Sequence, residues 1–452
     1  MVAIAMIGAP ITGVTFISVP GMVLDKGYSY LQMGLGFIVG YLVIALVLIP
    51  LYYRLNIVSI YGFLEKRFGK TSCKTGAWLF FVSKILGISV RFLIVCAMLQ
   101  LLVFEPIGIP YYISVLVSLI FIWISTFKGG VKSVIWGDVL KSTCLFSAII
   151  LCLYFISVNL GFSLTEMRNN ISDHYSSRIF YFDDPSDAKY FWKQFLAGIF
   201  IVIAMTGLDQ DMMQRSLACK NAKDSRKNLI VSSLMQFVVI ALLLILGSVM
   251  VIFMESKGMP MPEKTDNLFA TVTFHQDIPL VVGVLFIIGL VSATYSSVAS
   301  ALTSMTTTVS YDLMEVDRNT PPRVLKTKRI AVHTLISLLM ALFVICFYYL
   351  NREDAITTVY TLISYTDGPI LGLFLFGILT KRQVNEKWLP VVCCLSPVIS
   401  WFIQWELNNM IGYEIGFELL IINASLTFGG LYLISVLSSR NIGESKAINL
   451  SR

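Results

Sequence analysis

Twelve apolar runs constrain this chain more than any other feature, because each is long enough to cross about 30 Å of hydrocarbon as a helix. They lie near residues 2–19, 30–53, 75–103, 110–126, 134–159, 187–206, 229–254, 279–312, 330–350, 355–379, 388–408 and 415–438. Charged residues make up only 13% of the 452 residues, whereas soluble domains are about one-quarter charged. We therefore expect an all-α polytopic membrane protein whose surroundings are the lipid bilayer.

The basic residues indicate how these runs are oriented. If the loop 54–74 is cytoplasmic, most of the 34 Lys and Arg fall on the cytoplasmic side, as the positive-inside rule requires. Both ends of the chain are then cytoplasmic, and we expect a multi-pass protein of the plasma (inner) membrane. The eight Cys lie in apolar segments or in loops assigned to the cytoplasm, so the sequence predicts no disulfide framework.

A stripe of hydroxyl groups follows one face of the run 279–312. At about 3.6 residues per turn, Ser297, Ser300 and Ser304 share this face, with Ser296 beside them. Oxygen is the ligand that a hard cation such as sodium takes, although small hydroxylated residues also let membrane helices approach closely. The stripe is longer than close packing needs, which favours a polar cavity beside this helix.

Two of the runs are poor candidates for continuous helices. The segment GAPITG at 8–13 places Pro10 between two glycines, and GLDQD at 207–211 ends the sixth run abruptly. Five helices separate the starts of the two broken runs, which point in opposite directions, so we expect two inverted repeats whose broken helices meet a solute near the midplane. The expected parts of this single transmembrane domain, 1–452, are repeat one at 1–159, repeat two at 187–380 and extra helices at 388–438.

Several polar residues lie deep inside the apolar runs. Arg91, in KILGISVRFLIV, suits a bidentate grip on a carboxylate, and a structural ion pair or snorkelling is the alternative. Gln32 and Tyr30 are further candidates for solute contact, with packing as the alternative. Asp367 has three open interpretations: a protonated hydrogen-bond donor, a partner of Lys84 or Arg91, or part of a water-filled vestibule.

Five stretches resemble, in order along the chain, motifs of the solute:sodium symporter family. They are YGFLEKRFG at 61–69, GGVKSVIWGDVLK at 129–141, GLDQDMMQRSLACKN at 207–221, SSVASALTS at 296–304 with YD at 311–312, and GPILGLFLFGI at 368–378. The resemblance implies a leucine-transporter-like 5+5 inverted repeat plus additional C-terminal helices. Family members usually have one more helix before the first broken one, so this chain looks short at its N-terminus.

The resemblance also implies where Na⁺ binds. Its principal site would use the backbone carbonyls of Gly8, Ile11 and Ala293 and the hydroxyls of Ser296 and Ser297. An unwound segment frees carbonyls that a helix would otherwise occupy, so five oxygens gather without a buried carboxylate.

A second sodium site is implied at Asp138, which matches an aspartate that reaches serines of the eighth helix in sialic acid transporters. Ser297 and Ser300 are its expected partners here. Residue 299 is Ala, where those relatives have a serine ligand. The alternative is an ion pair between Asp138 and Lys141 one turn later.

The solute residues are the least uniform part of the family. Thr12 and Thr15 match polar positions that hold sialic acid in its transporters. Val202 and Met205 replace the Asn and Tyr of the sugar-transporter pattern, which disfavours a galactose-type site. Asp367 stands where relatives commonly have a small or aromatic residue.

These features together predict a sodium-coupled symporter that imports a small organic solute by alternating access, for example an anionic sugar such as sialic acid. A neutral sugar, polyol, monocarboxylate or amino acid remains an alternative, as does proton coupling through Asp138 or Asp367. We do not expect an enzyme, because the three histidines are scattered, nor a sensor, nucleic acid as a partner, or a need to oligomerise.

Overall fold

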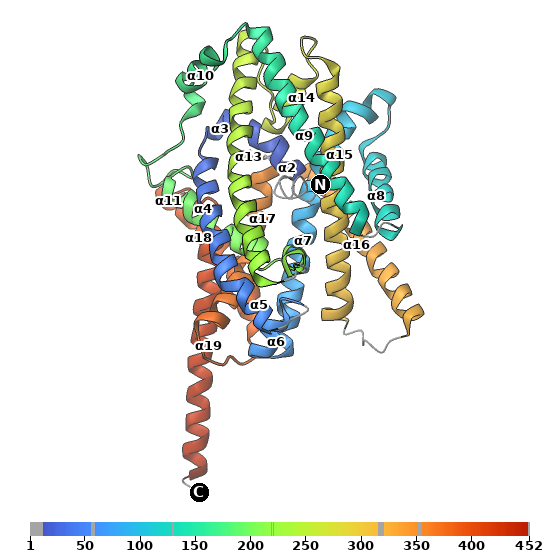
Figure 1. The fold of residues 1–452 in the computed structure, drawn as a ribbon. Coiled ribbons are helices and arrows are strands. Elements are labelled where there is room, and N and C mark those ends of the chain that lie inside the picture. Colours follow the sequence, from blue (N-terminus) through green and yellow to red (C-terminus); the bar gives the residue numbers. More distant parts are fainter. Residues whose placement is uncertain are drawn as a thin grey trace.

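The computed structural model is a bundle of long helices, and the described residues contain no strand (Figure 1). The structure describes residues 12–55, 59–128, 131–217, 219, 221–314, 321–350 and 355–450; side chains are not described at 125–128, 131–139, 164, 215, 322, 323, 355 and 438–450. The helices of the first half are α2 (Gly13–Gly21), α3 (Val23–Lys26), α4 (Tyr30–Val43), η1 (Ile44–Leu48), α5 (Ile49–Leu55), α6 (Gly62–Phe68), α7 (Lys70–Leu99), η2 (Gln100–Phe104), η3 (Glu105–Ile107), α8 (Tyr111–Lys128), α9 (Val131–Leu160), α10 (Leu164–Asp173) and η4 (Tyr175–Ser177). Those of the second half are α11 (Phe191–Val202), η5 (Ile203–Gly207), α12 (Gln210–Leu217), α13 (Ala222–Ser256), η6 (Thr265–Asn267), α14 (Leu268–Thr273), α15 (Leu280–Thr308), η7 (Val309–Leu313), α16 (Pro322–Leu350), α17 (Ala355–Leu379), α18 (Leu389–Ile411) and α19 (Leu419–Leu450).

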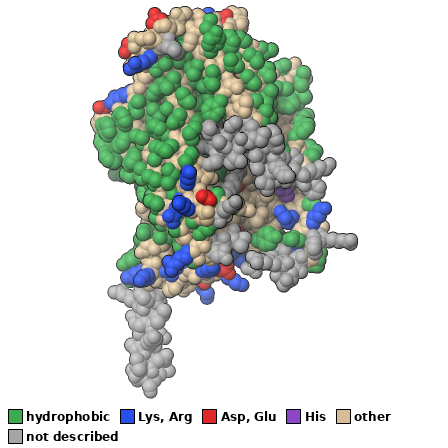
Figure 2. All heavy atoms as spheres, in the orientation of Figure 1, with side chains coloured by type: hydrophobic (Ala, Val, Ile, Leu, Met, Phe, Trp, Pro, Cys, Tyr) green, Lys and Arg blue, Asp and Glu red, His purple; other side chains and the backbone are tan. Residues whose placement is uncertain are grey.

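The apolar runs of the sequence become membrane-spanning helices. In the described part, nine helices are long and apolar enough to cross a membrane, and Tyr111–Ile124 and Phe191–Gly207 are shorter apolar helices. With α2, these segments match the twelve runs expected. Large apolar side chains face outward, for example Phe121 at 70% exposure and Trp401 at 57%, and green surface covers much of the face in Figure 2. The multi-pass prediction is confirmed.

The loops expected on opposite sides of the membrane lie at opposite ends of the bundle. Helices α10 and α14 lie at the upper end in Figure 1, whereas α6 lies at the lower end. Lys and Arg gather in the lower part of the face in Figure 2. Assigning this lower end to the cytoplasm remains a prediction from the positive-inside rule.

The short helix α2 lies among the long helices, in contact with α7, α13, α15 and α17. Thr12 precedes it in an extended conformation, with φ −92° and ψ 158°, and its hydroxyl accepts a hydrogen bond from the Thr15 backbone N–H. This N-cap sets the start of α2. The Phe16 ring then packs on Phe269 and Phe286, with centroids 4.9 and 5.9 Å away, which fixes α2 against α14 and α15.

The second predicted break is present at its expected place. Helix α11 ends at Val202, one π-helical turn follows over Ile203–Gly207, and Leu208 leaves the helical region with φ −111° and ψ 7°. A new helix, α12, begins at Gln210. The prediction that the sixth run ends at GLDQD is therefore confirmed. Of the first predicted break, residues 8–11 lie outside the described residues.

Helices α4 and α11 cross with their backbones in close contact. A Cβ atom on Gly198 would lie 2.3 Å from the Met33 carbonyl oxygen, and one on Gly36 would lie 2.2 Å from the Phe195 carbonyl oxygen. Small residues allow this approach, as at many helix crossings in membranes.

Gly198→Ala should therefore force these two helices apart and cost about 1–3 kcal/mol, the usual range for overpacking. The measurement is the thermal unfolding midpoint of the purified protein in detergent. Gly429→Ala on α19 is the matched control, because a Cβ there meets no atom within 4 Å. An equal midpoint for both variants would show that the crossing is not tight.

Candidate functional site

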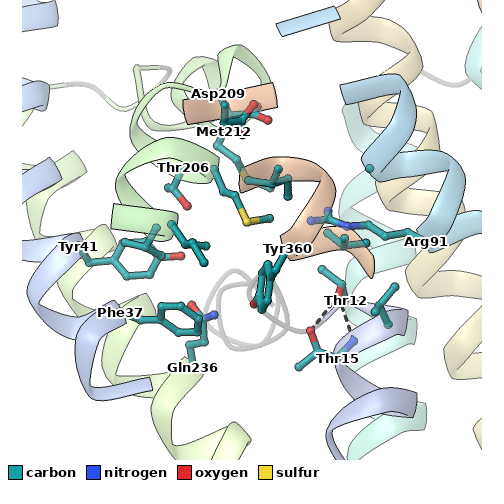
Figure 3. A pocket seen from close by; sticks show the side chains of 18 of the residues that line it. Thr12, Thr15, Phe37, Tyr41, Arg91, Thr206, Asp209, Met212, Gln236 and Tyr360 are labelled. Carbon is teal, nitrogen blue, oxygen red and sulfur yellow. Dashed lines mark hydrogen bonds between the residues drawn. The ribbon is translucent and has the colours of Figure 1, made fainter. Parts of the chain in front are cut away.

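A pocket of about 250 Å³ lies between the broken helices and the helices around them. Its wall includes Thr12 and Thr15 from α2, Phe37 and Tyr41 from α4, Ser83, Lys84, Gly87, Ile88 and Arg91 from α7, Met205 and Thr206 from η5, Asp209 and Met212 beyond the second break, Gln236 from α13, and Tyr360 and Asp367 from α17. Figure 3 shows Arg91 reaching from α7 toward Tyr360, with Thr12 and Thr15 nearby and Phe37 and Tyr41 across the space. The pocket thus joins both broken segments, as expected for an inverted-repeat fold.

The helix periodicity explains which residues of α7 face the pocket. Gly87, Ile88 and Arg91 follow Lys84 by three, four and seven residues, which places all four on one face. A Cβ atom on Gly87 would meet nothing within 4 Å. The missing side chain therefore leaves open space between the two cationic residues.

Three of the four predicted solute residues meet in this pocket. The Thr12 and Thr15 hydroxyls lie 2.9 Å apart, and Arg91 lies on the same side of the pocket (Figure 3). Gln32 is placed elsewhere: it does not line the pocket, and its buried amide donates to the Lys189 carbonyl at 2.9 Å and accepts from the Tyr181 N–H at 3.1 Å. These bonds hold the segment before α11 and leave Gln32 with a structural part.

Tyr30, a further candidate, lies just behind the pocket wall. Its hydroxyl is 2.7 Å from that of Tyr360, and Tyr360 itself lines the pocket. Sequence reasoning did not single out Tyr360. The available signal was spacing, because Tyr360, Ile363 and Asp367 recur on one face of α17.

Arg91 carries the least compensated positive charge of the pocket wall. Among the described residues, no carboxylate oxygen lies within the 4.0 Å ion-pair limit of its guanidinium. The alternative of a structural ion pair for Arg91 is therefore not supported. A charge at this depth is costly unless a partner or water accompanies it.

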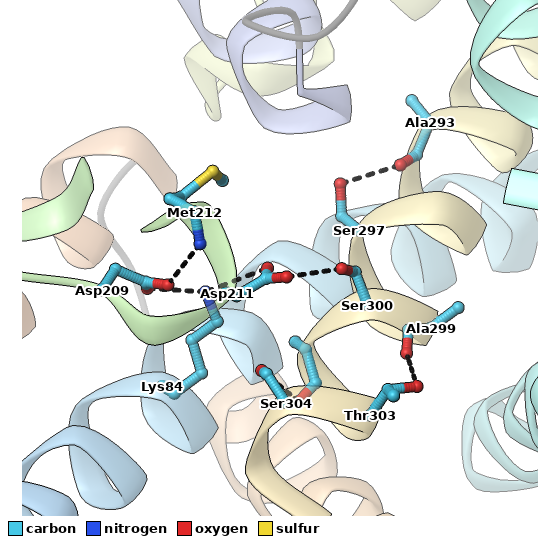
Figure 4. Close-up of polar contacts among 11 residues, drawn as sticks. Lys84, Asp209, Asp211, Met212, Ala293, Ser297, Ala299, Ser300, Thr303 and Ser304 are labelled. Carbon is cyan, nitrogen blue, oxygen red and sulfur yellow. Dashed lines mark hydrogen bonds and ion pairs between the residues drawn. The ribbon is translucent and has the colours of Figure 1, made fainter. Parts of the chain in front are cut away.

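Lys84, by contrast, is fully engaged (Figure 4). Its Nζ lies 2.6 Å from Asp209 Oδ2 and 3.4 Å from Asp211 Oδ2. The Ser300 hydroxyl donates to Asp211 Oδ1 at 2.6 Å. This network links α7, α12 and α15 at one end of the pocket.

The network corrects one sequence-based idea about Asp367. Lys84 pairs with Asp209 and Asp211, and Asp367 makes no ion pair within 4.0 Å with Lys84 or Arg91. Ser300, expected beside Asp138, donates to Asp211, and because the Asp138 side chain lies outside the described residues its expected contact with Ser300 stays a prediction. GLDQD predicts a helix break and forms part of a family motif, and its two carboxylates beside the break are in addition a signal of a polar site.

The described part of the predicted sodium site lies where α2 meets α15. The Ser297 hydroxyl donates to the Ala293 carbonyl at 3.0 Å, and Ser296 is 3% exposed. A Cβ on Gly13 would lie 2.9 Å from Thr294 Oγ1 and 3.7 Å from Ala293 Cβ. The first turn of α2 therefore touches α15 at the predicted ligands, whose hydroxyl and carbonyl oxygens suit a hard cation.

The remaining predicted ligands belong to the part of the chain that the structure does not describe. Gly8 and Ile11 lie outside the described residues, and so does the side chain of Asp138. Helix α9, which carries Asp138, does lie against α15. A second sodium site between these helices therefore stays a prediction.

Comparisons with known proteins agree with this arrangement. The sequence model of the sodium:solute symporter family matches residues 1–387. The chain is 25% identical to the sodium/sialic acid symporter NanT of Aliivibrio fischeri over 92% of this chain and 83% of that protein. It is 22% identical to the sodium/sialic acid symporter SiaT of Proteus mirabilis over 94% and 86% of the two chains.

A solved structure shows the same fold. It is a substrate-bound, outward-open state of a Na⁺-coupled sialic acid symporter, with a TM-score of 0.74, 19% identity, and coverage of 96% of this chain and 89% of that one. The expected leucine-transporter-like inverted repeat is confirmed. The chain belongs to the sodium:solute symporter family, and sodium-coupled symport of a solute is its function.

Proposed function

We propose that this symporter imports a small organic solute that carries a carboxylate, and that Arg91 binds this carboxylate. The observation that carries the proposal is the Arg91 guanidinium on the pocket wall, without an ion-pair partner among the described residues. The planar guanidinium matches a carboxylate with two parallel hydrogen bonds. Sialic acid, named for the two bacterial relatives, is one solute with such a group.

Thr12 and Thr15 complete the proposed solute site. Their hydroxyls line the same pocket, and each can donate to or accept from polar groups of the solute. Both belong to the start of α2, whose position therefore decides how well the pocket binds.

Sodium would couple to the solute through α2. The proposed ligands Ala293, Ser296 and Ser297 lie on α15, at the point where the first turn of α2 touches it. Together with the carbonyls of Gly8 and Ile11, they would hold an ion at this junction. An ion there favours one position of α2 and thereby of Thr12 and Thr15. By linkage, a solute that favours the same position tightens sodium binding equally.

Asp138 and Ser300 are proposed to serve a second sodium ion. The support is the contact of α9, which carries Asp138, with α15, which carries Ser300.

Removing either proposed sodium hydroxyl should weaken activation by sodium. Ser296→Ala and Ser297→Ala each delete one of five oxygens, so we expect the half-saturating sodium concentration to rise about tenfold, equivalent to 1.4 kcal/mol. The measurement is solute uptake into proteoliposomes as a function of external sodium. Ser304→Ala, on the same helix with its hydroxyl bonded to the Ala301 carbonyl, should leave sodium activation unchanged. A normal sodium dependence in both site variants would show that these hydroxyls serve only helix packing.

Arg91 should determine whether carboxylate solutes bind. Arg91→Lys keeps the charge but loses the bidentate geometry, so we expect its binding free energy for a carboxylate solute to weaken by about 1.5–3 kcal/mol. Arg91→Ala removes both the charge and the geometry, so its loss of binding free energy should be larger. Binding can be followed as the solute-induced shift of the thermal unfolding midpoint in sodium. Unimpaired carboxylate binding by Arg91→Ala would contradict the proposal.

A further inference from the structure

Asp367 is a pocket residue to which the proposed carboxylate site assigns no part. It belongs to α17, lines the pocket and is only 9% exposed. A buried carboxylate is costly unless a cation or hydrogen-bond donors satisfy it. The Ser83 hydroxyl lies beside this carboxylate, but a neutral hydroxyl balances no charge.

The charged residues of the pocket wall fall into two groups. Lys84 and Asp209 neutralise one another at 2.6 Å, with Asp211 as a second partner of Lys84 at 3.4 Å. Arg91 and Asp367 have no ion pair within 4.0 Å among the described residues. The pocket therefore presents one unmatched cation and one unmatched anion to whatever it binds.

The helix directions bring these two side chains toward a common space. Arg67, just before α7, donates to the Gly377 and Thr380 carbonyls at the end of α17, while Ser83 is next to Asp367 further along. Helices α7 and α17 are therefore antiparallel neighbours. Side chains in a helix tilt toward its N-terminus, so Arg91 leans toward the level of Ser83 and Asp367 leans toward the level of Arg91.

The separation suits a bound group better than a direct ion pair. Eight residues separate Ser83 from Arg91, which is about 12 Å of helix rise, and the long Arg91 side chain shortens this gap. What remains has room for a compact molecule between the guanidinium and the carboxylate. The pocket volume of about 250 Å³ lies just below the usual range of ligand pockets, about 300–1,000 Å³, which also favours a compact solute.

The geometry points to a zwitterionic solute, such as an amino acid, whose carboxylate binds Arg91 and whose ammonium group binds Asp367. This inference rests on the proposed function, because it takes the contact between Arg91 and a carboxylate as its first half. An ammonium group fits Asp367 better than a solute hydroxyl, since only the ammonium balances the charge of the buried carboxylate, which a second hydroxyl beside Ser83 would leave uncompensated. Asp367 then sets specificity, separating amino acids from simple carboxylates.

Matched solutes test this inference on the full-length protein. The probes are the twenty common amino acids, β-alanine, 4-aminobutyrate and N-acetylneuraminate. Each amino acid is compared with the carboxylate that has the same carbon skeleton but no amine. Alanine, lactate and propionate form one matched series, in which the α-carbon carries an amine, a hydroxyl or neither. Dissociation constants come from titrated shifts of the thermal unfolding midpoint in sodium.

We expect the best zwitterion to bind at least about tenfold more tightly than its counterparts with a hydroxyl or no group at that carbon, a ratio equivalent to 1.4 kcal/mol. Asp367→Asn should reduce this ratio below about threefold and leave the affinity for the simple carboxylate intact. Arg91→Lys should weaken both members of each pair alike. Asp25→Asn, which removes an exposed carboxylate of α3, should keep the full ratio.

The possible failures are distinguishable. If simple carboxylates bind the unmodified protein as tightly as amino acids do, and depend on Arg91, the inference about Asp367 is wrong while the proposed function stands. This comparison needs no variant, so it holds even if Asp367→Asn does not fold. If Asp367→Asn folds and keeps the tenfold preference, the ammonium group binds elsewhere and the inference is again wrong. If no solute of either kind binds, both proposals are overturned.

Discussion

A hydrocarbon bilayer offers no hydrogen bonds, so each polar group at the midplane must find its partner inside the protein or in what the protein carries. Several hydroxyls of α15 meet this demand within their own helix: Ser297 donates to the Ala293 carbonyl and Thr303 donates to the Ala299 carbonyl. Lys84 meets it through Asp209 and Asp211, which come from beyond the second helix break. Satisfied groups of this kind hold the helices in place.

The exceptions to this constraint mark the function. Arg91 and Asp367 line the pocket without an ion pair among the described residues, and the broken helices supply backbone groups that a continuous helix would have used itself. Charged side chains and backbone groups that the fold leaves without a partner can bind the transported solute and ion. On this view, solute and sodium supply partners that the described residues do not give to the polar groups of the pocket. Helix α2 connects the two because it contacts both the pocket and α15.

Sequence patterns predicted the parts of this architecture that depend on local chemistry. Length and hydropathy placed the membrane helices, and GLDQD placed the second break, because a glycine followed at once by two carboxylates interrupts an apolar run. Depth in an apolar run was enough to put Arg91 at the pocket. The network of Lys84 with Asp209 could not be predicted, since its members are 125 residues apart in the chain. Gln32 shows the same limit: it is buried as expected of a polar residue in an apolar run, but only the packing of α4 decides that it faces the segment before α11.

The direct test of the account is to drive transport with one ion gradient at a time. Purified protein in proteoliposomes would be given labelled carboxylate and amino acid solutes, with either an inward sodium gradient or an inward proton gradient at equal membrane potential. One charge moving across about 100 mV supplies roughly 2.3 kcal/mol, so a sodium-coupled carrier should accumulate solute above its external concentration. We expect the labelled solute to accumulate with the sodium gradient and not to accumulate with the proton gradient in sodium-free buffer. Accumulation driven by protons without sodium would contradict it.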